Sequence, residues 1–188
     1  RGESCVTRKI TRSAAKIALG LQDKLYLGNL SAQRDWGHAK DYVEAMWLIL
    51  QQEKAEDFVI ATGVTTTVRE FVRMAFGELG ISVEFSGKAE AEKGVIIDVD
   101  IERVKELGLD PDKIKLGQTI VKVDPSYYRP TEVDLLIGDP SKANSKLGWI
   151  PKYNLEMLVN EMVLSDLKLM KREEYLKKGG FDILNYFE

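Results

Sequence analysis

The sequence predicts an α/β fold in which the end of a doubly wound sheet is joined to a small mixed α/β lobe. Helical and strand-like segments alternate along the 188 residues, which is the order typical of α/β proteins. The strand-like segments are few and short, so they do not suit a self-sufficient nucleotide-binding sheet. The hydrophobic share of 44% and the charged share of 30% are those of a globular chain with a real core.

The first part of the chain reads as helix, short strand, polar loop and helix. Residues 6–19 place apolar side chains at helical spacing, and Gly20 can end that helix in the left-handed conformation. Residues 25–27 predict a short strand. The helix over residues 41–52 is apolar on most sides, so we expect it to be covered on more than one face. Its main apolar stripe consists of Val43, Met46, Trp47 and Leu50.

The middle of the chain holds a strong strand pattern and the clearest helix start. Residues 58–61 are Phe, Val, Ile and Ala, a continuous apolar run that predicts a central strand buried on both faces. Thr67 and Glu70 form a capping box at the start of an amphipathic helix, and Gly80 follows that helix. Residues 83–85 alternate in polarity and predict a short strand.

Patterns are weak over residues 86–118. A strand at residues 94–99 and a short helix at residues 102–107 are the elements that this segment suggests. Residues 120–123 then predict a further short strand.

The end of the chain carries two more helix starts. Asp139 is placed to cap a short helix that has Pro140 at its first position and Gly148 at its end. The last long helix begins after Asn154.

Composition excludes several classes of protein. Lys and Arg number 27 against 30 Asp and Glu, and the basic residues are scattered, so no nucleic-acid partner is expected. Cys5 is the only cysteine, which excludes an internal disulfide and a cysteine zinc site and fits a cytoplasmic protein. No apolar run has the length of a membrane span, so no membrane partner is expected.

The motifs of several enzyme classes are missing from the chain. There is no Gly-x-Gly-x-x-Gly turn, no Gly-x-Ser-x-Gly elbow and no tyrosine with a lysine four residues later. We therefore predict no catalytic residue and no metal site here. The chain begins at Arg1 without an initiator methionine, and we interpret it as the C-terminal part of a longer protein.

Cations in three segments are candidates for binding an anionic ligand. Lys9 lies near the start of the first helix, although it also fits a solvated basic face. Arg34 beside Asp35 is either a phosphate or ribose clamp or a surface ion pair. Arg129 precedes a proline and is followed by Glu132, a spacing that suits a nucleotide diphosphate about as well as an ordinary loop ion pair.

The loop that starts at Arg34 also contains Trp36, His38 and Asp41. Trp36 suits a core position, and His38 suits a structural role beside a helix start. We interpret these three residues as scaffold and Arg34 as the loop residue that contacts a ligand.

A set of segments gives the chain a family resemblance. In chain order they are Val-Thr-Arg-Lys-Ile at 6–10, Leu-Tyr-Leu-Gly-Asn-Leu at 25–30, Arg-Asp-Trp-Gly-His-Ala-Lys-Asp-Tyr-Val at 34–43, Asp-Phe-Val-Ile-Ala-Thr-Gly at 57–63, Tyr-Arg-Pro-Thr-Glu-Val at 128–133, Gly-Asp-Pro-Ser-Lys-Ala at 138–143 and Leu-Gly-Trp at 147–149. Together with the last helix they resemble the C-terminal half of the GDP-mannose 4,6-dehydratase family, within the extended short-chain dehydrogenases/reductases. The resemblance is weakest over residues 88–118.

The resemblance implies that residues 1–188 are the substrate-binding part of an NADP-dependent lyase, with the end of its NAD(P)-binding Rossmann-like sheet. Such a lyase converts GDP-mannose to GDP-4-keto-6-deoxy-mannose on the route to GDP-fucose. Its glycine-rich turn and catalytic residues precede the matching segment, so the chain alone is expected to be inactive. The full enzyme is expected to be a homodimer or homotetramer. The family pattern assigns Val6, Lys9, Arg34, Arg129 and Glu132 to the GDP moiety, and Arg1 to the cofactor.

Two alternatives remain beside this hypothesis. One is another nucleotide-sugar dehydratase or epimerase, because an Arg-Asp loop is shared across the superfamily. The other is a non-catalytic, truncated module that acts through binding or assembly.

Overall fold

The computed structural model describes residues 5–128 and 133–181. The predicted α/β class is confirmed, because helices alternate with strands that form two small sheets. Arg1, Arg129 and Glu132 of the predicted site lie outside the described residues.

The larger sheet has four strands and mixed direction. β1 pairs with β6 in parallel, whereas the β6–β5 and β5–β4 pairs are antiparallel. Its strands, in spatial order, are β1 (Leu25–Leu27), β6 (Thr119–Val123), β5 (Lys93–Val99) and β4 (Ile81–Ser86). The weak sequence pattern over residues 94–99 therefore did indicate a real strand.

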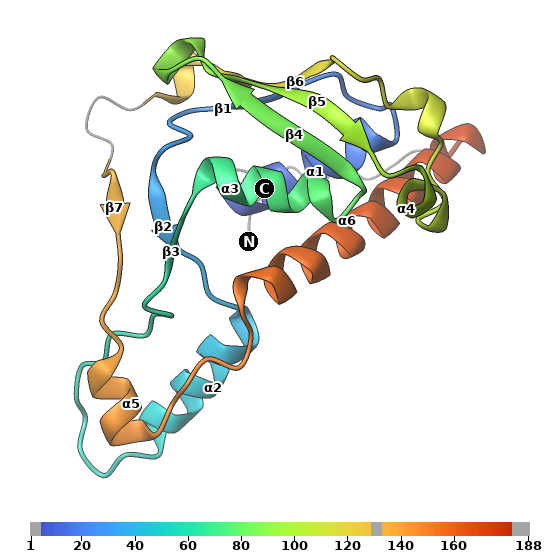
Figure 1. Cartoon of the computed structure of the whole chain (residues 1–188). Helices are drawn as coiled ribbons and strands as arrows, with labels where there is room; N and C mark the ends of the chain where they lie inside the picture. The colour runs from blue at the N-terminus through green and yellow to red at the C-terminus, as the bar shows by residue number, and fades with distance from the viewer. Residues whose placement is uncertain (1–4, 129–132, 182–188) are drawn as a thin grey trace.

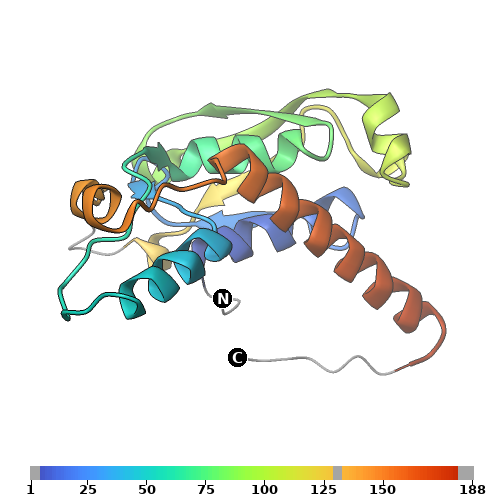
Figure 2. The ribbon, with the colours of Figure 1, turned by 90° about the horizontal axis from the view of Figure 1, so that it is seen from below.

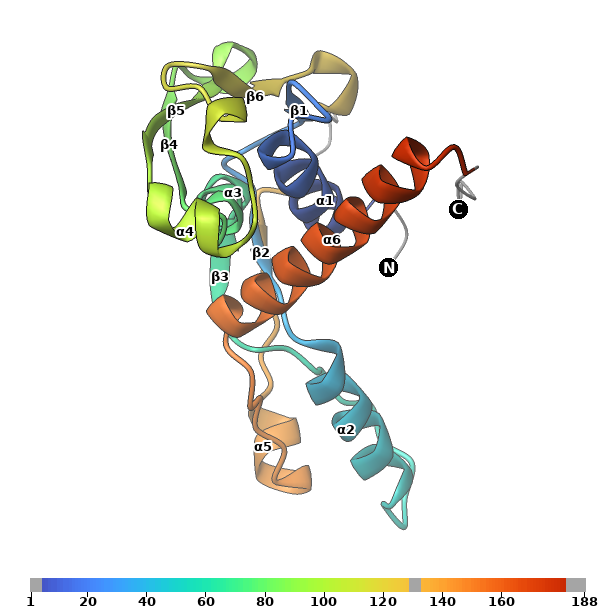
Figure 3. The same cartoon turned by 90° about the vertical axis from the view of Figure 1, so that its right-hand side faces the viewer.

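Three helices cover one face of this sheet. They are α1 (Val6–Ala18), α3 (Val68–Gly77) and α6 (Leu155–Lys178), which contact one another on the same side of the strands (Figures 1 and 3). Figure 2 shows the long α6 beside α1. Their buried side chains share one core with the strands, and Ile10, Phe71 and Val159 lie in it with no exposed surface. This core fixes the start of α1, which carries Val6 and Lys9.

A second, three-stranded sheet continues from this body. Its strands, in spatial order, are β3 (Thr65–Thr67), β2 (Gln33–Asp35) and β7 (Leu135–Leu136). The pair β2–β3 is antiparallel and the pair β2–β7 is parallel, so Arg34 lies opposite Thr66 on one side and Leu136 on the other. The remaining elements are α4 (Ile101–Glu106) and the short 3-10 turns η1 (Ala89–Ala91), η2 (Pro111–Lys113) and η3 (Pro125–Tyr127).

Two helices extend away from the larger sheet. α2 (Ala39–Leu50) and α5 (Ser141–Leu147) lie side by side (Figures 1 and 3) and pack around a small separate core that contains Trp149. We call residues 39–61 and 138–150 the α2–α5 arm. None of the described helices is long and apolar enough to cross a membrane.

The prediction that α2 is covered on more than one face is wrong for this structure. Its main apolar stripe is exposed, with Val43 at 63%, Met46 at 61%, Trp47 at 59% and Leu50 at 81%. Only Ala45 and the first-turn Asp41 are buried on this helix. The described part of the chain provides α5 as a neighbour and leaves the rest of the helix uncovered.

The predicted central strand at residues 58–61 is also wrong. These residues have no strand conformation, and Val59 is 53% exposed. Phe58 and Ile60 instead pack partly against the small core of the α2–α5 arm. A strand requires a neighbour for its backbone hydrogen bonds, and the described residues place none beside this run.

The predicted helix boundaries are largely confirmed. Thr67 accepts a hydrogen bond from the Glu70 amide at 3.1 Å, and Asn154 accepts one from the Met157 amide at 2.9 Å. Gly148 ends α5 in the left-handed conformation with φ 63°. Asp139 accepts from the amide of Ser141, so α5 begins one residue later than predicted.

Candidate functional site

Lys9 projects from the first turns of α1 onto an aromatic ring. Its ammonium nitrogen lies 3.5 Å from the centre of the Tyr127 ring, which is close enough for a cation–π interaction. The described residues place no carboxylate within ion-pair distance of Lys9, and the neighbouring Arg8 is tied to Asp166 at 3.8 Å. The positive charge of Lys9 is therefore available to an anion at this surface.

Arg34 reaches across from β2 to the chain segment before β7. One terminal guanidinium nitrogen, Nη1, donates to the carbonyl of Gln33 at 2.9 Å and to the carbonyl of Val133 at 2.6 Å. Gln33 is itself held in the sheet, since its amide donates to the carbonyl of Asp134 at 2.7 Å. The guanidinium thus lies at the edge where β2 meets the segment that leads to Leu135.

These contacts bracket the segment that carries Arg129 and Glu132. Lys9 contacts Tyr127, two residues before Arg129, and Arg34 binds Val133, one residue after Glu132. Lys9 and Arg34, from distant parts of the sequence, thus contact the described chain before and after residues 129–132, respectively.

Val6 occupies the same end of α1. Its side chain is half-buried and packs against the main core, so it fixes the helix start while the outer part of the residue stays accessible. The helix begins at Val6 without a side-chain cap, and its first turn has no acidic residue. The positive end of the helix dipole therefore favours negative charge near this turn.

Several residues that follow Arg34 make structural contacts, and three of them, Trp36, His38 and Asp41, were interpreted as scaffold from the sequence. Asp35 accepts hydrogen bonds from the amides of Thr62 and Gly63 at 3.0 and 2.8 Å. His38 caps α2, since its Nδ1 accepts a hydrogen bond from the Lys40 amide at 3.2 Å. The other ring nitrogen, Nε2, faces the Glu161 carboxylate at 3.2 Å.

Trp36 and Asp41 complete this scaffold. The Trp36 ring meets Phe71 edge-on with centroids 4.8 Å apart, so it belongs largely to the core. Asp41 is buried and accepts from the amides of Lys152 and Tyr153, both at 3.1 Å.

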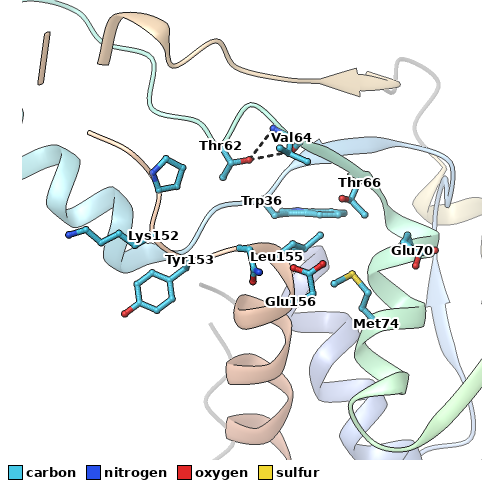
Figure 4. Close-up of a pocket in the computed structure, with 12 residues that line it drawn as sticks. Trp36, Thr62, Val64, Thr66, Glu70, Met74, Lys152, Tyr153, Leu155 and Glu156 are labelled. Atoms are coloured by element: carbon cyan, nitrogen blue, oxygen red, sulfur yellow. Dashed lines mark hydrogen bonds between the residues drawn. The ribbon is translucent and has the colours of Figure 1, made fainter. Parts of the chain in front are cut away.

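A cavity of about 610 Å³ lies between the starts of α3 and α6 (Figure 4). Trp36, Glu70, Met74, Leu155 and Glu156 line it. Its one lining cation, Lys152, is held by Glu44 at 2.6 Å. With two carboxylates and a neutralised lysine, this cavity does not suit a diphosphate.

The described residues contain no group of three or more His, Cys, Asp and Glu side chains placed to hold a metal ion. The predicted cofactor residue Arg1 lies outside them, and the chain has no Gly-x-Gly-x-x-Gly turn. Contact of this chain with a dinucleotide therefore stays a prediction, and the described residues of the predicted site contribute the cations Lys9 and Arg34.

A sequence model of the GDP-mannose 4,6 dehydratase family matches residues 1–162. The chain belongs to this family. GDP-mannose 4,6-dehydratases of Yersinia enterocolitica and Vibrio cholerae are 54% and 52% identical to it over 183 residues. The dehydratase of Dictyostelium discoideum is 51% identical over 179 residues, which cover 95% of this chain and 44% of that protein. The alignment to each bacterial relative covers 97% of this chain and 47% of the relative, so the chain spans about half the length of these dehydratases.

Solved structures show the same fold at low identity. RMD from Pseudomonas aeruginosa, complexed with NADPH, matches 90% of this chain and 44% of its own with TM-score 0.61 and 17% identity. A UDP-glucose 4-epimerase from Thermotoga maritima, with UDP-glucose, matches 91% of this chain and 41% of its own with TM-score 0.56 and 22% identity. At these identities the two structures support the fold of this chain and do not identify its ligand.

Sequence reasoning did not single out two residues of this surface. Tyr127 and Val133 contact Lys9 and Arg34, respectively, although each is far from its partner in the sequence. The sequence signal that could have identified them is their position on either side of residues 129–132.

Proposed function

We propose that this chain is the substrate-binding part of a GDP-mannose 4,6-dehydratase and that it binds the GDP moiety through Val6, Lys9, Arg34, Arg129 and Glu132. The observation that carries the proposal is the bracketing of residues 129–132. Lys9 and Arg34, which come from different elements, contact the residues on either side of this segment. A diphosphate bound there meets positive charge from two directions.

Energetics favour binding over bond-making for these residues. A hydrogen bond between a charged cation and a phosphate oxygen contributes about 1.5–3 kcal/mol. Two or three such bonds position a nucleotide sugar firmly and need no proton transfer from the cations. Arginine can donate two parallel bonds to a phosphate, whereas lysine acts as a point charge.

The chemical steps are proposed to lie in the part of the enzyme that this chain lacks. NADP is proposed as its cofactor, in line with the NADPH complex of the RMD neighbour. When bound, NADP would accept and return the hydride of the internal oxidation and reduction. The chain itself supplies binding and orientation of the GDP-sugar, and it is proposed to be inactive in isolation.

The exposed stripe of α2 supports this division of labour. Val43, Met46, Trp47 and Leu50 are all more than half exposed, and such a cluster on one helix is typical of a surface that another part of a protein covers. The chain spans about half the length of its dehydratase relatives, and we propose that the other half of such an enzyme covers the stripe. We further propose a cytoplasmic homodimer or homotetramer for the whole enzyme.

Calorimetry and turnover assays test the proposal. The whole protein that contains this chain should bind GDP and GDP-mannose, discriminate against UDP-glucose, and dehydrate GDP-mannose. Lys9→Ala should weaken GDP binding, whereas Lys16→Ala near the far end of the same helix should not.

Three results would count against the proposal. Tighter binding of UDP-glucose than of GDP-mannose would favour another nucleotide-sugar enzyme. Absence of turnover in the whole protein would favour a binding or assembly module. Turnover by residues 1–188 alone would contradict the division between binding and chemistry.

A further inference from the structure

We propose that Tyr127 is a positioning residue for Lys9, whose ammonium it holds at the diphosphate site without neutralising it. This inference rests on the proposed function, because it explains how one of the GDP-binding cations is kept in place. It assigns Tyr127 no contact with the ligand.

The Lys9 side chain needs a partner to occupy one position. A lysine has four rotatable side-chain bonds and loses conformational entropy when it is ordered. The Tyr127 ring receives the ammonium at 3.5 Å from its centre, which is well within cation–π distance. Part of the ordering cost is therefore met before a nucleotide binds.

An aromatic ring suits this purpose better than a carboxylate would. The ring attracts the ammonium through its quadrupole and carries no net charge, so the full positive charge remains for a phosphate. A carboxylate in its place would compete with the diphosphate. The contrast is visible on the same helix, where Arg8 and Arg12 lie 3.8 and 3.7 Å from Asp166.

Asp124 is a carboxylate close enough to Lys9 for the two charges to interact, and one of its oxygens is already engaged. Oδ1 accepts hydrogen bonds from the Ser126 amide at 2.9 Å and from the Ser126 hydroxyl at 2.8 Å. These bonds, and to a smaller extent the charge of Lys9, hold the pKa of Asp124 below its ordinary value. Asp124 thus serves as the cap of η3 and leaves the ring as the direct partner of Lys9.

The ring itself sits on a rigid turn. The Tyr127 amide donates to the carbonyl of Asp124 at 3.0 Å, and the Asp124 amide donates to the carbonyl of Leu27 at 2.8 Å. Pro125 fixes the backbone at the start of η3. A Cβ added to Gly28, the residue after β1, would lie 2.4 Å from the Tyr127 carbonyl oxygen, so Gly28 packs directly against the backbone of η3.

The test compares GDP affinity and kinetics for variants of the whole protein. Tyr127→Leu should raise the Kd for GDP and the KM for GDP-mannose about two- to fivefold, the factor that corresponds to an exposed cation–π contact, with kcat unchanged. Tyr127→Phe keeps the ring and should match the wild type. Tyr26→Leu, at a tyrosine of similar exposure on β1, is the matched control and should also match it.

A second comparison shows whether Tyr127 acts through Lys9. In a Lys9→Met background, Tyr127→Leu should cause no further loss of GDP affinity. An equal loss in both backgrounds would overturn the inference, even if the leucine variant also proved less stable. A wild-type Kd for Tyr127→Leu would overturn the inference as well. In that case a raised Kd for GDP in Lys9→Met would still support the proposed function. Failure of the wild-type protein to bind GDP would instead reject the proposed function.

Discussion

Asp41 is predicted to fasten the α2–α5 arm to the rest of the molecule. The carboxylate is 2% exposed, and its two oxygens accept from the amides of Lys152 and Tyr153, each at 3.1 Å. The indole of Trp149 donates to the Asp41 backbone carbonyl at 2.9 Å, a bond that a side-chain substitution leaves in place. Asp41→Ala and Asp41→Asn therefore change the carboxylate contacts alone.

The expected cost follows from these two contacts. Each hydrogen bond to a charged acceptor contributes about 1.5–3 kcal/mol, so Asp41→Ala should destabilise the arm by about 3 kcal/mol or more. Asp41→Asn retains one acceptor oxygen but turns an amide N–H toward the second donor. Its cost should be about half that of alanine.

Hydrogen exchange at the amides of Lys152 and Tyr153 measures this directly. A loss of about 3 kcal/mol should speed their exchange on the order of 100-fold when the opening is local. Glu44→Gln is the matched control, since Glu44 binds the side chain of the same Lys152 at an exposed position. The reasoning is refuted if Asp41→Ala leaves both amides exchanging within about threefold of wild type, or if Glu44→Gln has an equal effect.

Three further predictions concern the proposed nucleotide site, the packing of Gly28 against η3, and the contact of Glu161 with the start of α2. Arg34→Ala in the whole enzyme should raise the KM for GDP-mannose at least about tenfold with little loss of kcat, because one charge-assisted bond is worth about 1.5–3 kcal/mol; a collapse of kcat at constant KM would make the loop catalytic. Gly28→Ala should lower the free energy of unfolding by about 1–3 kcal/mol in urea titrations, whereas Gly77→Ala, where an added Cβ meets no atom within 4 Å, should not be destabilising. Glu161 has its pKa lowered from 4.5, chiefly by the hydrogen bond from Lys40, so its stabilising effect should be present above that value and be lost as the pH falls through the lower folded pKa. A stability difference between wild type and Glu161→Gln that persists at lower pH would contradict this assignment.

Local signals in the sequence predicted the helices well, because their physical causes are local. A side-chain cap such as Thr67 or Asn154 satisfies amides two or three residues away, whatever the rest of the fold does. Gly148 likewise ends α5 through its own backbone freedom. These features can be predicted from a window of a few residues.

Residues 58–61 show where local reasoning fails. The apolar run has the composition of a buried strand, but a strand forms only when neighbouring strands supply hydrogen-bond partners. The described residues provide none, so the run stays irregular and Val59 remains exposed. The exposed stripe of α2 has the same cause, since its apolar pattern indicates burial against something that the described chain does not contain.

The candidate site was predictable only in part for a similar reason. The resemblance assigned Lys9 and Arg34 to the site, but no spacing in the sequence predicted that they contact Tyr127 and Val133. Arg34 meets Val133 across 99 positions of sequence, and only the pairing of β2 with β7 brings the two together. Contacts of this kind depend on strand register, which no short window of sequence determines.

The partners of the basic side chains separate structural cations from those available to a ligand. Asp166 is 4% exposed, accepts from the Thr11 hydroxyl at 2.6 Å and lies beside Arg8 and Arg12, so their charge serves the α1–α6 contact. Lys9, one residue after Arg8, points to a neutral ring instead. Since adjacent helix positions differ by about 100° in direction, α1 can present Arg8 and Arg12 to α6 and Lys9 to η3. The same helix thus stabilises the fold through Arg8 and Arg12 and carries Lys9, the cation that we propose for the diphosphate.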